Sequence, residues 1–110
     1  MRKSYTAVIE RNQIWSESFE TEPYEAGWAS EAIFFVRTLE ASRLNGGLKA
    51  QIQISPDGIH WCNEGTDIYL STVPAVTFGR VRHFGTYLRL VGTLPEGLEL
   101  KVIAYLSLKE

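Results

Sequence analysis

Two histidines and one cysteine are the side chains of this sequence best suited to metal binding or nucleophilic catalysis. His60 and Cys62 stand two positions apart, which on a strand would place both on one face, and His83 is the only other histidine. A structural zinc site uses four ligands at short, recurring spacings. A reactive cysteine needs a partner base and surroundings that lower its thiol pKa. The sequence supplies neither pattern, so we expect no metal, no cofactor and no catalytic residue, and we interpret the protein as a non-enzyme.

Aromatic side chains give a stronger functional signal, because the chain contains three tryptophans and five tyrosines in 110 residues. Exposed aromatic rings anchor protein interfaces, and in a sugar-binding protein they would stack on pyranose rings. Tyr24 and Trp28 lie in a turn-rich segment, and Trp61 follows another turn. These three residues are the candidate ligand-binding residues if the protein binds a glycan.

Charge is distributed unevenly along the chain. The formal net charge is -2, which argues against a general nucleic-acid partner. Residues 10–31 contain six glutamates and one arginine, whereas residues 72–95 contain three arginines, one histidine and no acid. These charges either pair between neighbouring strands of one sheet or form two complementary patches that meet between subunits. The candidate interface residues on the second interpretation are Arg80, Arg82, Arg89, Glu17, Glu20 and Glu22.

The elements that must position these side chains read as β-strands. Leu48, Ala50, Ile52 and Ile54 alternate with the polar residues Lys49, Gln51, Gln53 and Ser55, which is the period-2 pattern of a half-buried strand. The turn Ser55-Pro56-Asp57-Gly58 follows, with Gly58 suited to positive φ. Ile59 and Trp61 then restart the alternation. We therefore predict an antiparallel hairpin over residues 48–62.

Further strands are predicted over residues 4–10, 13–21, 76–84, 86–92 and 98–109. In the segment 76–84 the apolar phase shifts around Gly79, as a β-bulge would shift it. In the last strand, Ile103 and Tyr105 stand on the face that is otherwise polar. We expect a loop or another subunit to cover these two residues, which makes them further interface candidates.

Residues 30–42 fit two structures. A helix could begin at Ser30 as its N-cap and end at Asn45-Gly46. The β-branched and aromatic centre, residues 33–38, instead favours a central strand buried on both faces. We favour the strand.

These elements predict a single domain over residues 1–110: an all-β, two-sheet antiparallel β-sandwich, jelly-roll-like, with about eight strands. No apolar run reaches the length of a membrane span. No apolar stretch follows Arg2 and Lys3, so we expect no signal peptide. Together with a single cysteine, this favours a cytoplasmic or particle-associated location and no membrane partner.

Two resemblances to known families arise from these motifs. The strand at residues 48–54, the Ser55-to-Trp61 hairpin and the later Tyr87-Leu88-Arg89 strand resemble the second half of discoidin-type β-sandwich lectin domains. That resemblance implies the fold and carries over no calcium or sugar residue. Over nearly the whole chain, the layout also resembles small stand-alone β-sandwich proteins of phage virions, which build or decorate shells and tails.

The second resemblance implies a structural role. We expect a non-enzymatic assembly subunit that forms a homo-oligomer or decorates a larger particle such as a shell, tail or filament. Its partners would be itself or a larger protein assembly. The alternative is a carbohydrate-binding module with a glycan as partner.

Overall fold

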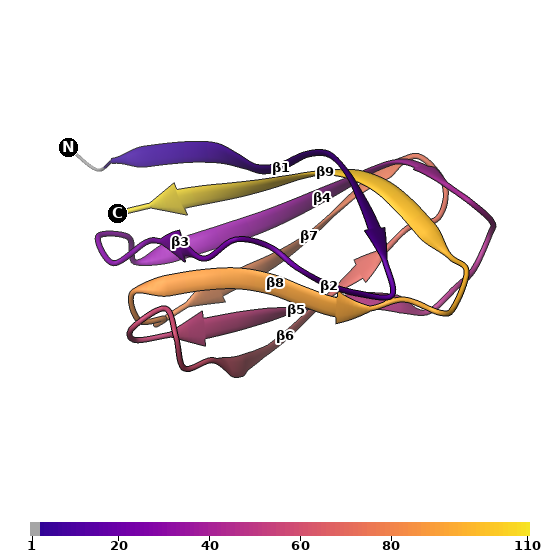
Figure 1. Cartoon of the computed structure of the whole chain (residues 1–110). Coiled ribbons are helices and arrows are strands. Elements are labelled where there is room, and N and C mark those ends of the chain that lie inside the picture. Colours follow the sequence, from indigo (N-terminus) through magenta and orange to yellow (C-terminus); the bar gives the residue numbers. More distant parts are fainter. Residues whose placement is uncertain (1–2) are drawn as a thin grey trace.

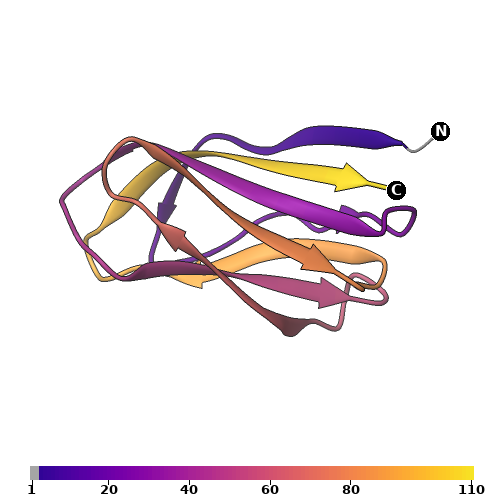
Figure 2. The same cartoon turned by 180° about the vertical axis from the view of Figure 1, so that it is seen from behind.

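The chain folds into two antiparallel β-sheets that pack face to face (Figures 1 and 2). The computed structural model describes residues 3–110. One sheet has the order β1 (Ser4–Ser16), β9 (Glu99–Lys109), β4 (Glu31–Ala41) and β7 (Ala75–Arg82). The other has the order β2 (Ser18–Glu20), β8 (Tyr87–Thr93), β5 (Leu48–Ser55) and β6 (Cys62–Leu70), and the short β3 (Tyr24–Glu25) also pairs with β8. The predicted all-β sandwich is confirmed, with nine strands in place of about eight because β3 had not been expected.

Strict alternation along the strands builds the core between the two sheets. On β9, every second residue from Leu100 to Leu108 is buried, and the residues between them face outward. Ala32, Phe34 and Val36 of β4 face the same interior. The opposite sheet adds an apolar layer that includes Ile52, Ile68, Leu88 and Leu90. This burial stabilises the sandwich without a disulfide, since Cys62 is free and exposed.

The segment that fitted either a helix or a strand is β4, so the helical alternative is wrong. β4 pairs with β7 on one side and β9 on the other, which places it inside the sheet. A strand in that position needs apolar residues on its inner face and tolerates them on its outer face. Phe34 and Val36 are buried in the core, whereas Ile33 and Phe35 on the outer face are only half-buried, so the predicted burial on both faces is wrong. Among the described residues there is no helix long and apolar enough to cross a membrane.

The first two predicted strands, over residues 4–10 and 13–21, are arranged differently in the structure. β1 continues through Asn12, which lies between the predicted strands 4–10 and 13–21, and accommodates it in an irregular stretch where the register with β9 shifts. The chain reverses at Glu17 instead, with φ at 50°. The predicted strand over 13–21 is therefore split, and its apolar members Trp15 and Phe19 stack with ring centroids 4.1 Å apart in the core.

The bulge predicted at Gly79 is absent, because β7 pairs with β4 from Ala75 to Arg82 without a register shift. The apolar phase changes for another reason: Val76 and Phe78 face outward and are exposed, whereas Val81 faces the core. Gly79 also faces inward, and a Cβ there would stand 2.6 Å from Cγ1 of Ile68. The phase shift in the sequence therefore marks exposed apolar residues on the outside of the sheet.

The hairpin between β5 and β6 has a longer connection than predicted. β6 begins at Cys62, so Ile59 and Trp61 belong to the loop. The buried Ser55 hydroxyl accepts hydrogen bonds from the N–H groups of Asp57 and Gly58 at 3.2 and 2.8 Å. Gly58 has the positive φ, 80°, that the turn sequence required.

The sandwich has two distinct lateral edges. β1 lies against β2 on one side, and β6 lies against β7 on the other. Figure 1 views the molecule from the side of β1, β2 and β3, and Figure 2 views it from the side of β6 and β7. Residues on β2 and β7 are thus held on opposite sides of the molecule.

Candidate functional site

Four apolar side chains form a row across the outer face of the four-stranded sheet. Backbone register aligns Val8 with Tyr105, Tyr105 with Phe35, and Phe35 with Phe78. The rings of Phe35 and Phe78 contact each other with centroids 6.2 Å apart. Phe78 is 52% exposed and Val8 is 40% exposed, whereas the two central residues are half-buried. We refer to these four residues as the apolar row.

The apolar row is widened by residues in the neighbouring registers. Ile103 and Val76 flank Arg37 on one side of it. Ile33 lies on the other side, level with Arg80 and Ser107. The predicted interface residues Ile103 and Tyr105 therefore belong to one continuous apolar patch, which the sequence showed only as two irregular positions on β9.

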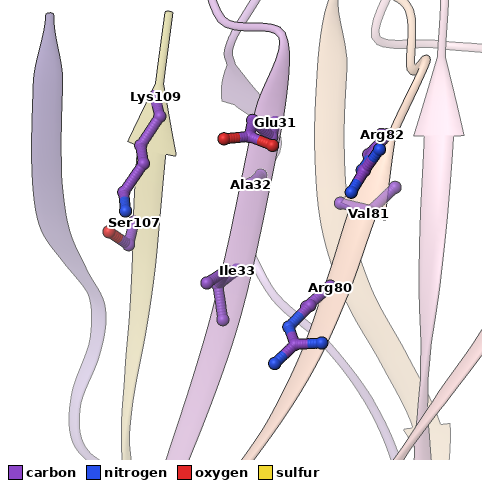
Figure 3. A pocket seen from close by; sticks show the side chains of 8 residues that line it. All are labelled: Glu31, Ala32, Ile33, Arg80, Val81, Arg82, Ser107 and Lys109. Carbon is purple, nitrogen blue, oxygen red and sulfur yellow. The ribbon is translucent and has the colours of Figure 1, made fainter.

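A shallow hollow of about 220 Å³ adjoins the apolar row (Figure 3). Its charged lining comes from three strands: Arg80 and Arg82 from β7, Glu31 from β4, and Lys109 from β9. Lys109, Glu31 and Arg82 share one register across the sheet, and Arg80 stands in the next. We refer to this site as the basic hollow, since it combines three cations with one carboxylate.

The cations of the basic hollow are open to a partner. Arg80 places its guanidinium carbon 5.3 Å from the ring centroid of Phe78, so a cation–π contact links the hollow to the apolar row. Within residues 3–110, no ion pair involves Arg80, Arg82 or Lys109. The arrangement can therefore accept an anionic group such as a carboxylate, with an apolar group beside it.

Arg89, the third predicted basic interface residue, lies on the other sheet and is already paired. Its Nη1 lies 3.0 Å from Oε2 of Glu20, and its Nε donates to Oε1 of Gln53 at 2.8 Å. Gln53 in turn donates to Asn63 at 2.9 Å. The Arg89 side chain is only 18% exposed. For Arg89 and Glu20 the interpretation of charges pairing between neighbouring strands is thus confirmed, and we call Glu20, Arg89, Gln53 and Asn63 the polar row.

The three candidate glycan-binding residues are held in three separate environments. Trp61 stacks beneath Arg89, whose guanidinium carbon is 4.2 Å from the ring centroid. Tyr24 is half-buried, and burial, followed by the neighbouring Tyr5, raises the pKa of its phenol. Trp28 is exposed in the segment between β3 and β4. Throughout the described chain no ring contact joins these side chains, so the structure does not assemble them into one site.

Acidic residues gather along the edge formed by β2 and β3. Glu17 and Glu22 flank β2, and Glu25 lies in β3, where its carboxylate accepts the N–H of Gly27 at 2.9 Å. All three are exposed. We call Glu17, Glu22 and Glu25 the acidic edge. It lies on the side of the sandwich opposite β7.

Glu10 on β1 is affected by the negative charge of the acidic edge. Partial burial raises the pKa of its carboxyl, and the charge of Glu22 raises it further. The buried indole N–H of Trp15 has no hydrogen-bond partner in the described structure. It nevertheless lies close enough to Glu10 to lower the pKa of that carboxyl slightly. Glu17, Glu22 and Glu25 form no ion pair among the described residues.

The described residues contain no group of three or more histidine, cysteine, aspartate or glutamate side chains placed to hold a metal ion. No family model and no curated protein matches the chain. A solved carbohydrate-binding module, CpGH89CBM32-5 from Clostridium perfringens in complex with GalNAc-beta-1,3-galactose, is similar in fold, with 14% identity, 94% of each chain covered and a TM-score of 0.46.

This match does not decide between the two family resemblances. Its low identity and TM-score say nothing about what this chain binds. The function has to be argued from the surfaces of the molecule itself.

Proposed function

We propose that the protein is a non-catalytic docking subunit of a protein assembly, and that the outer face of its four-stranded sheet is the docking surface. The observation that carries this proposal is the apolar row. Contiguous exposed apolar patches are uncommon on monomeric soluble proteins and mark interaction sites when polar residues border them. Phe78 and Val8 stand exposed at the two ends of this row, with the half-buried rings of Phe35 and Tyr105 between them.

The chemistry of the partner follows from the neighbouring basic hollow. Arg80 touches both the hollow and the row through its contact with Phe78. A partner that places carboxylates over Arg80 and Arg82 would form charge-assisted hydrogen bonds while its apolar groups cover the row. The surface thus fits a protein partner whose contact region combines acidic and apolar side chains.

A small fluorescent probe with the same chemistry tests this surface. The dye 8-anilinonaphthalene-1-sulfonate carries a sulfonate on a fused aromatic system, and its emission rises in apolar surroundings. We expect the native protein to bind it saturably. The double variant Arg80→Gln/Arg82→Gln and the variant Phe78→Ser should each bind at least about fivefold more weakly, which corresponds to ~1 kcal/mol.

Tyr69→Ser is the matched control, because Tyr69 is an aromatic residue on the other sheet that is even more exposed than Phe78. It should leave dye binding unchanged. Far-ultraviolet circular dichroism and a urea titration confirm that each variant is folded. The proposal is wrong if the wild-type protein binds no dye below its unfolding transition, or if Tyr69→Ser weakens binding as much as Phe78→Ser.

A second candidate function, glycan binding, is favoured by the polar row on the five-stranded sheet. Trp61 and the side chains of Arg89, Gln53 and Asn63 place an aromatic ring beside amide and guanidinium donors. Next to them lies a groove of about 430 Å³, lined by polar residues around Val91, namely Ser18, Glu20, Gln51 and Thr93. Sugars are recognised by such combinations of ring faces and hydrogen-bonding groups.

A glycan array probed with the labelled protein tests this second function. Saturable binding to a defined glycan that is lost in Trp61→Ala and kept in Phe78→Ser would support it. Binding that survives Trp61→Ala, or no binding to any glycan on the array, would contradict it.

A further inference from the structure

We infer that the partner of the docking surface is a second copy of this chain, bound head to tail, so that the basic hollow of one copy receives the acidic edge of the next. This inference rests on the proposed function, because it names the occupant of the same surface. Three independent features of the molecule support it: the positions of the two surfaces, the absence of ion pairs at their charged residues, and the exposed apolar residues beside them.

The first feature is position. Arg80 and Arg82 lie on β7, the last strand of its sheet, beside β6. Glu17 and Glu22 flank β2, the outermost strand of the other sheet, beside β1 on the far side of the sandwich. Figures 1 and 2 show these two sides in turn. A single copy cannot bring the two surfaces together, whereas two copies related by a translation along the sheet can.

The second feature is charge. Arg80 and Arg82 have no ion pair in the described part of the chain, and neither do Glu17 and Glu22. By contrast, Arg89 and Glu20 come from the same two stretches of sequence and pair inside the subunit at 3.0 Å. Apart from Glu31, which lies in the basic hollow, the unpaired acids of the first stretch lie on the side opposite Arg80 and Arg82. This arrangement steers copies into a head-to-tail encounter.

The third feature is apolar surface on the acidic side. Tyr5 of β1 is 54% exposed there and lies next to Tyr24, close to Glu25 of the acidic edge. On the basic side, Phe78 and Val76 are exposed to a similar degree. A contact between the two sides would therefore enclose apolar and aromatic residues within a charged rim, as protein interfaces do.

The consequence is an assembly that is not limited to a dimer. Each copy offers one surface of each kind, so a contact leaves one free hollow and one free edge. Repetition of such a heterologous contact closes into a ring if the rotation between copies permits and otherwise extends into a filament. This agrees with the structural role that we propose for the subunit.

Charge-swapped variants provide the decisive experiment. Variant A carries Arg80→Glu and Arg82→Glu, so that both of its surfaces are acidic. Variant B carries Glu17→Lys and Glu22→Lys, so that both of its surfaces are basic. We expect the wild type to self-associate in sedimentation velocity at concentrations up to about 1 mM, and each variant alone to associate at least about tenfold more weakly.

An equimolar mixture of the two variants should associate again, because each reversed surface then meets its complement on the other variant. The control variant Arg43→Glu/Lys49→Glu has the same change in net charge as variant A, at other positions, and should behave like the wild type. Heteronuclear correlation spectra of each variant establish that it is folded before the mass is measured.

The outcomes separate this inference from the proposed function. If the wild type stays monomeric at about 1 mM while the sulfonate dye still binds the apolar row, the docking surface stands and a second copy is not its occupant. If variant A still associates as the wild type does, or if the mixture of A and B does not, the head-to-tail contact is wrong. If the dye also fails to bind, both proposals fail.

Discussion

Gly92 occupies a position that has no room for a side chain. A Cβ there would stand 2.5 Å from Cζ of Phe19 and 3.0 Å from the carbonyl oxygen of Lys49. We expect Gly92→Ala to lower the free energy of unfolding by ~1–3 kcal/mol, because Phe19 must give up its stacking on Trp15 to make space. Urea denaturation followed by tryptophan fluorescence measures this loss.

Gly46→Ala is the control for this prediction. Gly46 has open space around its Cβ position and no positive φ. Replacing it should be neutral or stabilise the fold by ~0.4–1 kcal/mol through the unfolded chain. Equal effects of the two substitutions would show that the packing of Phe19 does not constrain residue 92.

Asp57 holds the turn between β5 and β6 through its charge. Its Oδ1 accepts the N–H groups of His60 and Ile59 at 2.8 and 2.9 Å, and its Oδ2 lies 2.7 Å from Nδ1 of His60. The backbone N–H of His60, followed by the His60 side chain, depresses the pKa of this carboxyl strongly. Because the folded-state pKa lies below the unfolded value of about 3.9, its contribution to stability is present above pH ~4 and is lost as the pH falls through the folded-state pKa.

The pH dependence of Asp57→Asn therefore has a definite sign. The variant should melt at a lower temperature than the wild type at pH 7, and the difference should shrink as the pH falls from about 4 towards 2. Calorimetry over that range measures it. Asp67→Asn removes only an exposed pairing with Lys49 at 3.5 Å and should change little at any pH. A difference for Asp57→Asn that stays constant with pH would contradict this account.

At the level of the strand, one face of β9 packs in the core and the other face contributes to the apolar row. Leu106 is fully buried opposite Phe34, whereas its neighbour Tyr105 lies in the apolar row. We expect Leu106→Ala to cost ~2–5 kcal/mol of unfolding free energy. Tyr105→Ser should cost under ~1 kcal/mol but weaken binding of the sulfonate dye. A large loss of stability in Tyr105→Ser with unchanged dye binding would assign Tyr105 to the fold alone.

The strands show which parts of the fold a sequence can reveal. The patterns of β8 and β9 were correct because one face of each meets the core. The pattern of β5 was correct from Leu48 to Ile52 and wrong at its end, where Ser55 is buried and Ile54 is only half-buried. β7 was misinterpreted at Gly79, because Val76 and Phe78 are apolar and yet face outward. An alternation argument assumes that apolar residues point inward, and it fails where apolar residues face outward, as Val76 and Phe78 do.

The whole molecule explains why the candidate site was only partly foreseen. Arg80, Arg82, Ile103 and Tyr105 were predicted as interface residues from charge and from the irregular face of one strand. The apolar row needs Val8 and Phe35 as well, and these come from strands that meet β9 only through non-local pairing. Strand order and register depend on contacts between distant segments, which no local pattern in the sequence contains. Non-local strand pairing also places Arg89 beside Glu20, so these two charges pair with each other inside the subunit.

The salt dependence of the molecular mass tests how charge and apolar surface share the proposed assembly. The Debye length is about 10 Å at 0.1 M salt and about 3 Å at 1 M. Screening therefore weakens the attraction between the acidic edge and the basic hollow, whereas burial of the apolar row persists at high salt. If charge pairing directs the head-to-tail contact, light scattering coupled to size exclusion should show a multimer at low salt and a mass near 12.4 kDa at about 1 M sodium chloride. A mass that rises with salt would mean that the apolar row associates by itself, and the contact would then be face to face.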